Sequence, residues 1–317
     1  MLSGIYRTIR SRGIIPTCQI AFNTLRWRIA RWRGQRLRAI RIHGFQMLVD
    51  MSDMGLSREL FIWRDREKAL RVILRQVIRP GMRVLDVGGN LGYYPLLEAQ
   101  LVGEHGEVHV LEPYPPNFEI LQKNVKLNAV EHRVRVQMLA AAEKNGECEF
   151  HVSKASNLGT LVKPQQGAEG LGLTGEVLRV QAVCLSDLVT SLGAVDLVRM
   201  DPEGAEVGIM KGLLRAIDTG CFSGRIITEI HSDRYTAANN IVPVIEALCA
   251  RGYRAEFVTS CDERASVLRE LGYQPTNCTR ESASVSRGIY VGVRGVDVIT
   301  AINAGSVRDL VLSRSQK

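Results

Sequence analysis

The chain has 317 residues, of which 45% are hydrophobic, with 41 Lys and Arg against 33 Asp and Glu. A chain of this length can bury one large core, or one core with an appendage. It contains no run of about eighteen apolar residues and no charged segment leading into an apolar one, so neither a membrane span nor a cleaved signal is expected. Seven cysteines without a C-x-x-C pair predict reduced thiols in a cytoplasmic protein and no structural zinc.

The first 44 residues form a basic arm. Ten arginines and no acid lie between Met1 and Phe45, and because the whole chain has 41 basic residues and 33 acids, the remainder is close to neutral. Helical spacing puts apolar side chains on one face, flanked by arginines 26, 28, 31 and 33; these apolar residues are Ala21, Phe22, Leu25, Ile29 and Trp32. Such a helix can pack on the body with its arginines in solvent, lie peripherally on the anionic inner membrane face, or attract a polyanion such as RNA.

Beyond the arm, strands and helices alternate, which predicts a mostly parallel sheet with helices on both faces. We expect a strand over 45–51, a helix over 57–78 capped by Ser57, and a late strand pair near 254–259 and 288–294. Between them the expected strands are 82–87, 107–112, 133–139, 195–200 and 225–231, and the expected helices are 91–101, 116–128, 205–217 and 240–251. A Gly-rich, lid-like insertion is expected over 154–176, between two strands of alternating pattern, and residues 296–317 are expected to be a C-terminal tail.

The most informative segment runs from Val84 to Gly92 and reads as a buried strand entering a glycine turn. A carboxylate at Asp86 would repel the phosphate that such turns often hold. A ligand with a sulfonium, an ammonium and a ribose but no phosphate, S-adenosylmethionine, suits the site better. We therefore expect the methionine end to lie against the strand end and the turn, that is against Asp86, Gly88, Gly89, Asn90 and Gly92.

A second acid, Glu112, ends the next expected strand about twenty residues after Gly92. Neighbouring strands of nucleotide-binding sheets place an acid at this distance for the ribose hydroxyls. A carboxylate can accept from both hydroxyls of a ribose without phosphate, so Glu112 is expected to bind the ribose.

The third motif, Val195 to Glu206, delivers Asp201 and Glu203 to the end of another strand. A further strand ends in Glu229 and His231. In open α/β sheets, ligands bind outside the carboxyl ends of the strands. Three acids and a histidine at that edge exceed what capping needs and indicate a functional site.

Together these motifs resemble the FkbM family of S-adenosylmethionine-dependent methyltransferases, within the Rossmann-like class, over roughly residues 45–259. The matching segments are 84–94, 111–113, Asn124 with 127–128, 201–206 and 229–231. Gly89 stands where the family usually has alanine, and Pro202 where it usually has valine. The resemblance implies a seven-stranded, mostly parallel sheet in a methyltransferase domain over 45–295. It also implies O-methylation of a hydroxyl on a sugar, glycolipid or other glycosylated or secondary metabolite.

A sugar hydroxyl is a poor nucleophile while protonated, so methyl transfer needs alignment and a base. We expect His231 to be that base, with Asp201 and Glu203 as competitors; these acids can alternatively ligate a divalent cation, although no metal is assigned. Two other functions stay open. One is an RNA methyltransferase steered by the basic arm, but Glu203 stands where a base-stacking aromatic is wanted. The other is a non-catalytic scaffold that binds a membrane or a partner.

Overall fold

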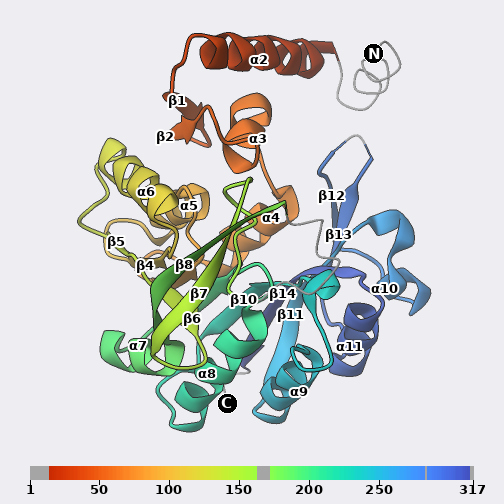
Figure 1. The fold of residues 1–317 in the computed structure, drawn as a ribbon. Coiled ribbons are helices and arrows are strands. Elements are labelled where there is room, and N and C mark those ends of the chain that lie inside the picture. Colours follow the sequence, from red (N-terminus) through yellow and green to blue (C-terminus); the bar gives the residue numbers. More distant parts are fainter. Residues whose placement is uncertain (1–13, 163–171, 283, 315–317) are drawn as a thin grey trace.

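A nine-stranded sheet with helices on both faces organises the chain, as Figure 1 shows. The computed structural model describes residues 14–162, 172–282 and 284–314. From edge to edge the strands are β12 (Asn277–Arg280), β13 (Ser286–Tyr290), β11 (Tyr253–Ser260), β14 (Val307–Arg314), β10 (Arg225–Glu229), β9 (Leu197–Met200), β3 (Arg83–Val87), β4 (Glu107–Leu111) and β5 (Val134–Gln137). The five strands from β10 to β5 are parallel, and this confirms the predicted fold class.

The seven strands predicted for the sheet correspond to β3, β4, β5, β9, β10 and the late pair β11 and β13, which pair antiparallel; β12 and β14 bring the sheet to nine strands. One prediction was wrong. Residues 296–317 are not a tail, because they contribute to α11 (Gly295–Asn303) and to β14, which pairs antiparallel with both β10 and β11. The final strand therefore lies inside the sheet, and its side chains Leu310 and Val311 are fully buried.

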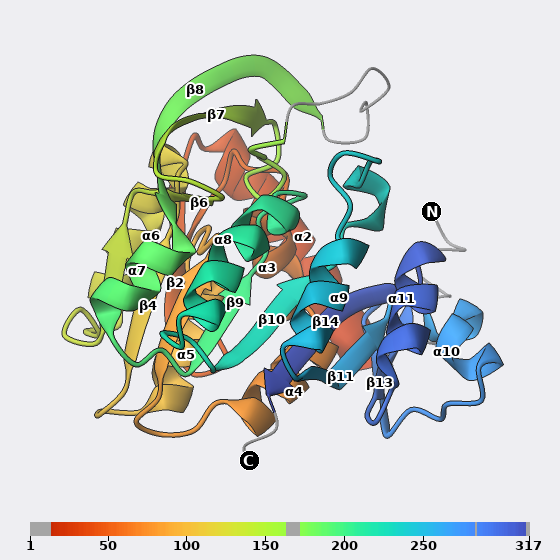
Figure 2. The same cartoon turned by 90° about the horizontal axis from the view of Figure 1, so that it is seen from below.

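Figure 2 shows helices on both sides of the sheet. Two hydrophobic cores lie between these helices and the two faces of the sheet. Strand side chains alternate between faces, so Val84 joins one core and Leu85 the other. The first core holds α3 (Leu56–Trp63), α4 (Lys68–Val77), α5 (Tyr93–Val102) and α6 (Pro115–Leu127); the second holds α7 (Leu185–Leu192), α8 (Glu206–Asp218), α9 (Val242–Ala250), α10 (Val267–Glu270) and α11.

The single helix predicted over 57–78 is two helices, α3 and α4. The chain breaks between them because Arg64 and Glu67 adopt left-handed backbone conformations, with φ of 55° and 44°. Ser57 is not a cap: it lies inside α3, and its hydroxyl accepts a hydrogen bond from the backbone N–H of Asp50. Arg66 and Glu67 lie in this break, and their largely buried side chains form an ion pair at 2.8 Å.

A smaller sheet of β6 (Ala140–Ala142), β8 (Leu173–Cys184) and β7 (Gly146–Ser153) extends from the main body. It frames the segment predicted as a lid over 154–176, whose last residues belong to β8. Residues 163–171 lie outside the described part of the chain. In the described part, the Ser156 hydroxyl donates to Asp53 at 2.7 Å, which holds this segment against the α3 side of the molecule.

The basic arm folds onto the body as α2 (Ile14–Trp32) and β1 (Leu37–Ile42), and β1 forms a hairpin with β2 (Phe45–Asp50), the strand predicted directly after the arm. Residues 1–13 lie outside the described part. The helix packs through Trp27, whose ring meets Phe61 of α3 at 5.3 Å between centroids. The apolar face predicted for this helix points instead to solvent, with Phe22 and Trp32 among its exposed members.

Candidate active site

The turn after β3 packs closely against the end of β9 and against β4 because Gly88 and Gly89 have no side chain. Gly88 has φ of 85°, and a Cβ there would lie 2.8 Å from the carbonyl oxygen of Asp201. A Cβ on Gly89 would lie 2.2 Å from Val110 Cγ1, which explains why this chain departs from alanine at that position. Gly92, with φ of 95°, begins α5. The glycines thus allow the turn to pack directly against the neighbouring elements.

Glu112 follows β4 and is tied to the glycine turn. Its Oε2 accepts from the Asn90 backbone N–H at 2.7 Å, and its Oε1 accepts from the Tyr114 backbone N–H at 2.9 Å. Burial raises the pKa of Glu112 to about 7, although the two backbone donors favour its ionised form. The Asn117 side chain is a third donor to this carboxylate, which still leaves a lone pair that can accept from a ribose hydroxyl.

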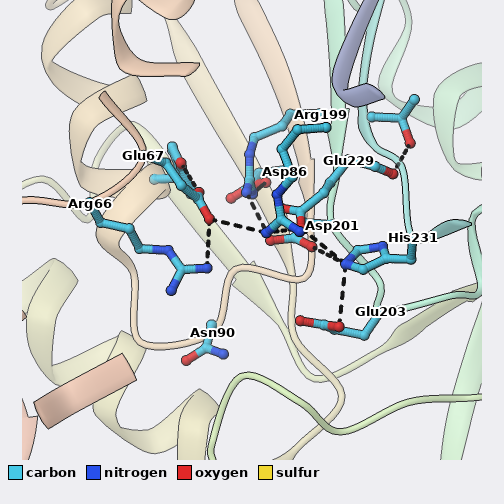
Figure 3. A network of polar contacts seen from close by, with 12 residues as sticks. Arg66, Glu67, Asp86, Asn90, Arg199, Asp201, Glu203, Glu229 and His231 are labelled. Atoms are coloured by element: carbon cyan, nitrogen blue, oxygen red, sulfur yellow. Dashed lines mark hydrogen bonds and ion pairs between the residues drawn. The ribbon is translucent and has the colours of Figure 1, made fainter. Parts of the chain in front are cut away.

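Asp86 lies fully buried beneath this space, where its Oδ1 accepts from Arg199 Nη1 at 2.7 Å. The Arg199 guanidinium also reaches Asp201 Oδ2 at 3.5 Å and stacks 3.7 Å from the Tyr94 ring centroid. Figure 3 shows Arg199 between the two acids. The predicted contact of Asp86 with the methionine end stays a prediction; the structure places Arg199, not Asp86, on the cavity wall.

His231 is the centre of an acidic cluster at the ends of β9 and β10 (Figure 3). Its Nε2 lies 3.1 Å from Glu229 Oε1, 3.3 Å from Glu203 Oε2 and 3.7 Å from Asp201 Oδ1. Its Nδ1 lies 2.6 Å from Glu206 Oε1 at the start of α8. The four residues predicted to converge from two strands are therefore together, with Glu206 holding the imidazole ring in place.

Three carboxylates of this cluster are also paired with an arginine. Arg234 Nη2 lies 2.5 Å from Glu203, Arg308 pairs with Glu229, and Arg199 reaches Asp201. Asp201, Glu229 and His231 offer ligand atoms within 4.8 Å of one another, which is close enough for a metal ion. A cation bound there would compete with the arginines for the same oxygens.

Burial and crowding keep protons in the cluster. Burial by itself lowers the pKa of His231, but Glu206 and Glu229 outweigh it and raise that pKa well above its usual range. Burial and the charge of Asp201 raise the pKa of Glu203 to about 8 and that of Glu229 to about 7. At neutral pH the imidazole is therefore protonated, and the cluster releases its protons as the pH rises through these values.

Glu203 also has an unusual backbone. Its φ of 52° is left-handed, a conformation that costs a non-glycine residue about 1–2 kcal/mol. The turn is held by Thr160, whose hydroxyl donates to the Glu203 carbonyl at 2.7 Å, and by Arg234 Nη1, which donates to the same oxygen at 2.9 Å. Strain that the surroundings maintain in this way is typical of functional sites.

A cavity connects these parts. Of the predicted cofactor residues, Gly88, Asn90 and Glu112 line it, and Asp201 and Glu203 line it too. Gly89 lines an adjoining pocket with Arg199 and Asp201. The described part of the lid-like segment closes one side, through residues that include Ser156, Asn157, Gly159 and Thr160.

The residues present fit S-adenosylmethionine. The cavity offers a buried carboxylate for a ribose, an apolar wall that includes Leu111, Leu139 and Phe150, and acids rather than phosphate-binding groups elsewhere in its lining. His231 lies behind this surface, 4% exposed, and contacts the cavity wall through Asp201 and Glu203.

Comparison with known proteins agrees with this geometry. Residues 86–255, more than half of the chain, match the model of the methyltransferase FkbM domain. The chain belongs to the FkbM methyltransferase family. The resemblance predicted from the motifs is confirmed, and with it the assignment to the S-adenosylmethionine-dependent methyltransferases.

Individual relatives match over shorter stretches. The 31-O-demethyl-FK506 methyltransferase FkbM of Streptomyces tacrolimicus is 30% identical over 163 residues, which are 43% of this chain and 61% of that relative. A protein-L-isoaspartate O-methyltransferase of Methanothrix thermoacetophila is 41% identical over 49 residues, which are 16% of this chain and 23% of that relative. Among solved structures, methyltransferase FkbM of Methylobacillus flagellatus KT aligns with a TM-score of 0.40 and 13% identity, over 74% of this chain and 52% of that one. The chain thus spans less than two thirds of each of these relatives.

Several site residues were missed by sequence reasoning. Arg199 interrupts the apolar strand Leu197–Met200, a signal that could have marked it as buried and paired. Glu206 lies within the family signature, but its role as the partner of His231 was not predicted. Nothing local distinguishes Arg234 or Arg308 from the many other arginines, because their acidic partners belong to other elements.

The pKa of Glu112 makes a prediction for cofactor binding. Ribose hydroxyls donate more strongly to a carboxylate than to a carboxylic acid, so affinity for S-adenosylhomocysteine should fall as the pH drops below about 7, by up to about tenfold per pH unit. Calorimetry between pH 5.5 and 8.5 measures this. Glu112→Gln should bind weakly at every pH, and Glu107→Gln, at the far end of the same strand, should behave as the parent. A pH-independent affinity in the parent would contradict the assignment.

Proposed function

We propose that the chain transfers a methyl group from S-adenosylmethionine to a hydroxyl oxygen of a sugar, glycolipid or other glycosylated or secondary metabolite. The observation that carries the proposal is that Asp201 and Glu203 line the same cavity as Glu112, from the ends of β9 and β4, the two strands that flank β3. A nucleoside bound through its ribose at Glu112 extends toward these acids, where an acceptor hydroxyl can be held.

The protein's own contribution is to align the acceptor and take its proton. When bound, S-adenosylmethionine supplies a methyl group on a sulfonium; that group passes to the acceptor oxygen as the carbon–sulfur bond breaks. Alignment alone can contribute about 7–11 kcal/mol. Asp201 is the carboxylate that we assign to the acceptor proton, because it lines both the cavity and the adjoining pocket.

In this proposal His231 acts through Asp201. A protonated imidazole cannot accept a second proton, and the raised pKa of His231 keeps that proton in place at neutral pH. Its positive charge, held by Glu206, offsets the crowded carboxylates and keeps Asp201 oriented toward the cavity. The sequence-based choice of His231 as the base remains the competing prediction.

We also propose that the protein works inside the cell, at the inner membrane face, with its basic arm as the contact. No helix within the described residues has the length and apolar character needed to cross a membrane. The arm supplies positive charge without acids, and anionic lipid headgroups attract such segments.

The deciding experiment follows the methyl group. Purified full-length protein is incubated with isotope-labelled S-adenosylmethionine and fractionated glycans, lipids and RNA, and products are analysed by mass spectrometry. Label in an ether-linked methyl group of a glycosylated product supports the proposal. Label in RNA, or on nitrogen, would show a different acceptor, and absence of both binding heat and transfer would favour the scaffold.

A further inference from the structure

Helix α2 has two apolar faces, and only one of them is covered. The inner face packs on α3 through Trp27 and Ala30, and the Asn23 side chain donates to the Ile62 carbonyl at 3.0 Å. The opposite face repeats large apolar side chains at intervals of three and four residues. Their exposed fractions are 59% for Phe22, 56% for Leu25, 40% for Ile29 and 84% for Trp32.

Two further exposed apolar side chains lie on the loop and the helix beside α2. Met54 is 50% exposed and Trp63 is 39% exposed, and Arg31 Nη1 lies 3.2 Å from the Met54 sulfur. Six of the twelve large apolar side chains exposed within the described residues belong to α2 and its neighbours, and we call them the α2 surface: Phe22, Leu25, Ile29, Trp32, Met54 and Trp63. Exposed apolar side chains gathered in one part of a protein mark interaction sites. Figure 1 shows α2 at one end of the molecule, above α3 and the β1–β2 hairpin.

The positive charge around the α2 surface indicates that its partner is anionic. Arg26, Arg28, Arg31 and Arg33 are exposed along the helix, and the Arg26 guanidinium lies over the Phe22 ring at 5.6 Å. No acid occurs in the sequence before Asp50. Apolar side chains bordered by arginines are typical of helices that lie in the plane of an anionic membrane, where long basic side chains reach the headgroups. RNA would engage the arginines and leave the aliphatic side chains in water.

A groove leads from the α2 surface toward the active site. Met54 and Trp63 line its outer end, together with Arg58 of α3. Arg66 and Asn157 line the groove and also the pocket that contains Gly88, Arg199 and Asp201. A molecule that entered beside Trp63 would therefore approach the proposed methyl-transfer site from the membrane side.

We propose that the α2 surface docks on an anionic lipid bilayer and that the acceptor is an amphiphile of that bilayer, whose hydroxyl-bearing head enters through the groove. The second part rests on the proposed methyl transfer. The apolar tail stays in the lipid, and only the polar head needs to pass Arg58 and Arg66.

Vesicle co-sedimentation of the full chain tests the docking. Phosphatidylcholine vesicles containing phosphatidylglycerol should bind the protein, less so at high salt, and pure phosphatidylcholine vesicles should not. Leu25→Ser/Ile29→Ser should weaken binding at least tenfold, because both side chains are exposed and their loss removes apolar contact without opening a core. Leu271→Ser/Val296→Ser, at exposed apolar positions elsewhere, is the matched control and should bind as the parent. Unchanged heat with S-adenosylhomocysteine shows that both variants fold.

Three results would overturn the docking: no binding to anionic vesicles, equal binding by Leu25→Ser/Ile29→Ser, or a parent dimer that this double substitution converts to a monomer. The acceptor class is tested by label transfer from S-adenosylmethionine in a lysate of the expressing cells. Label should enter the organic-soluble fraction, and the double substitution should reduce it. Label confined to the aqueous fraction would exclude a membrane amphiphile while leaving methyl transfer intact, whereas no label in either fraction would count against the methyl transfer itself.

Discussion

Replacing Asp201 by asparagine is expected to lower kcat for methyl transfer by about 10²–10⁴-fold, the usual contribution of a general base. Asparagine keeps the shape and one acceptor oxygen but cannot take the acceptor's proton. Affinity for S-adenosylhomocysteine should change little, because the ribose contact at Glu112 is untouched. Single-turnover kinetics and calorimetry on the same preparation separate the two effects. Asp233→Asn, an exposed acid two residues from His231, is the control and should keep parental turnover.

The pH profile of the parent enzyme adds a second readout. Burial and the charge of Asp201 raise the pKa of Glu203 to about 8. Above that pH Glu203 is ionised, and the more negative cluster attracts the acceptor's proton more strongly. Turnover should therefore rise as the pH increases through about 8. Glu203→Gln should remove this inflection. If instead Asp201→Asn keeps full turnover while His231→Gln abolishes it, the base is His231, and the imidazole must lose its proton when the acceptor binds.

Parallel strand topology explains why the site acids could be predicted from sequence. Glu112, Asp201 and Glu229 each lie at or beside the end of a short apolar run, and strands of such a sheet bring their carboxyl ends to one edge. The local sequence pattern was therefore enough to predict these acids and their meeting at one edge of the sheet. What the pattern could not give is pairing across the fold: Arg199 and Asp86 are 113 positions apart, and only the β3–β9 register brings them together.

The burial of helix α2 could not be predicted from the sequence either. Its periodicity identified the stripe of Phe22, Leu25, Ile29 and Trp32 correctly, but helical spacing does not say which stripe is covered. The structure buries Trp27 instead, because its large ring fits against Phe61 and the arginines beside the other stripe remain in solvent. Strand β14 was missed for a similar reason. It lies between β10 and β11, and no local sequence pattern indicates where in a sheet the last strand inserts.

Arg199→Met is expected to cost about 3–5 kcal/mol of unfolding free energy, as removal of one partner from a buried ion pair does. The guanidinium is 2% exposed and its partner Asp86 is fully buried, so the variant leaves a carboxylate without water or a cation. Burial already raises the pKa of the Asp86 carboxyl, and Arg199 opposes that rise. Without Arg199 the carboxyl should fold protonated, as neighbouring Glu98 does, whose pKa burial raises well above its usual range.

The stability lost in Arg199→Met should depend on pH. An acid whose pKa is higher in the folded than in the unfolded state binds more protons when folded, so the variant should lose stability as the pH rises above about 4, by up to about 1.4 kcal/mol per pH unit until the folded pKa is reached. The double variant Arg199→Met/Asp86→Asn removes both charges and should recover most of the loss, with no such slope. Urea unfolding of the three proteins between pH 5 and 8 gives the comparison. Equal stability of the single and double variants at pH 8 would show that Asp86 does not depend on Arg199, and the role of that arginine would then be confined to the cavity wall beside Asp201.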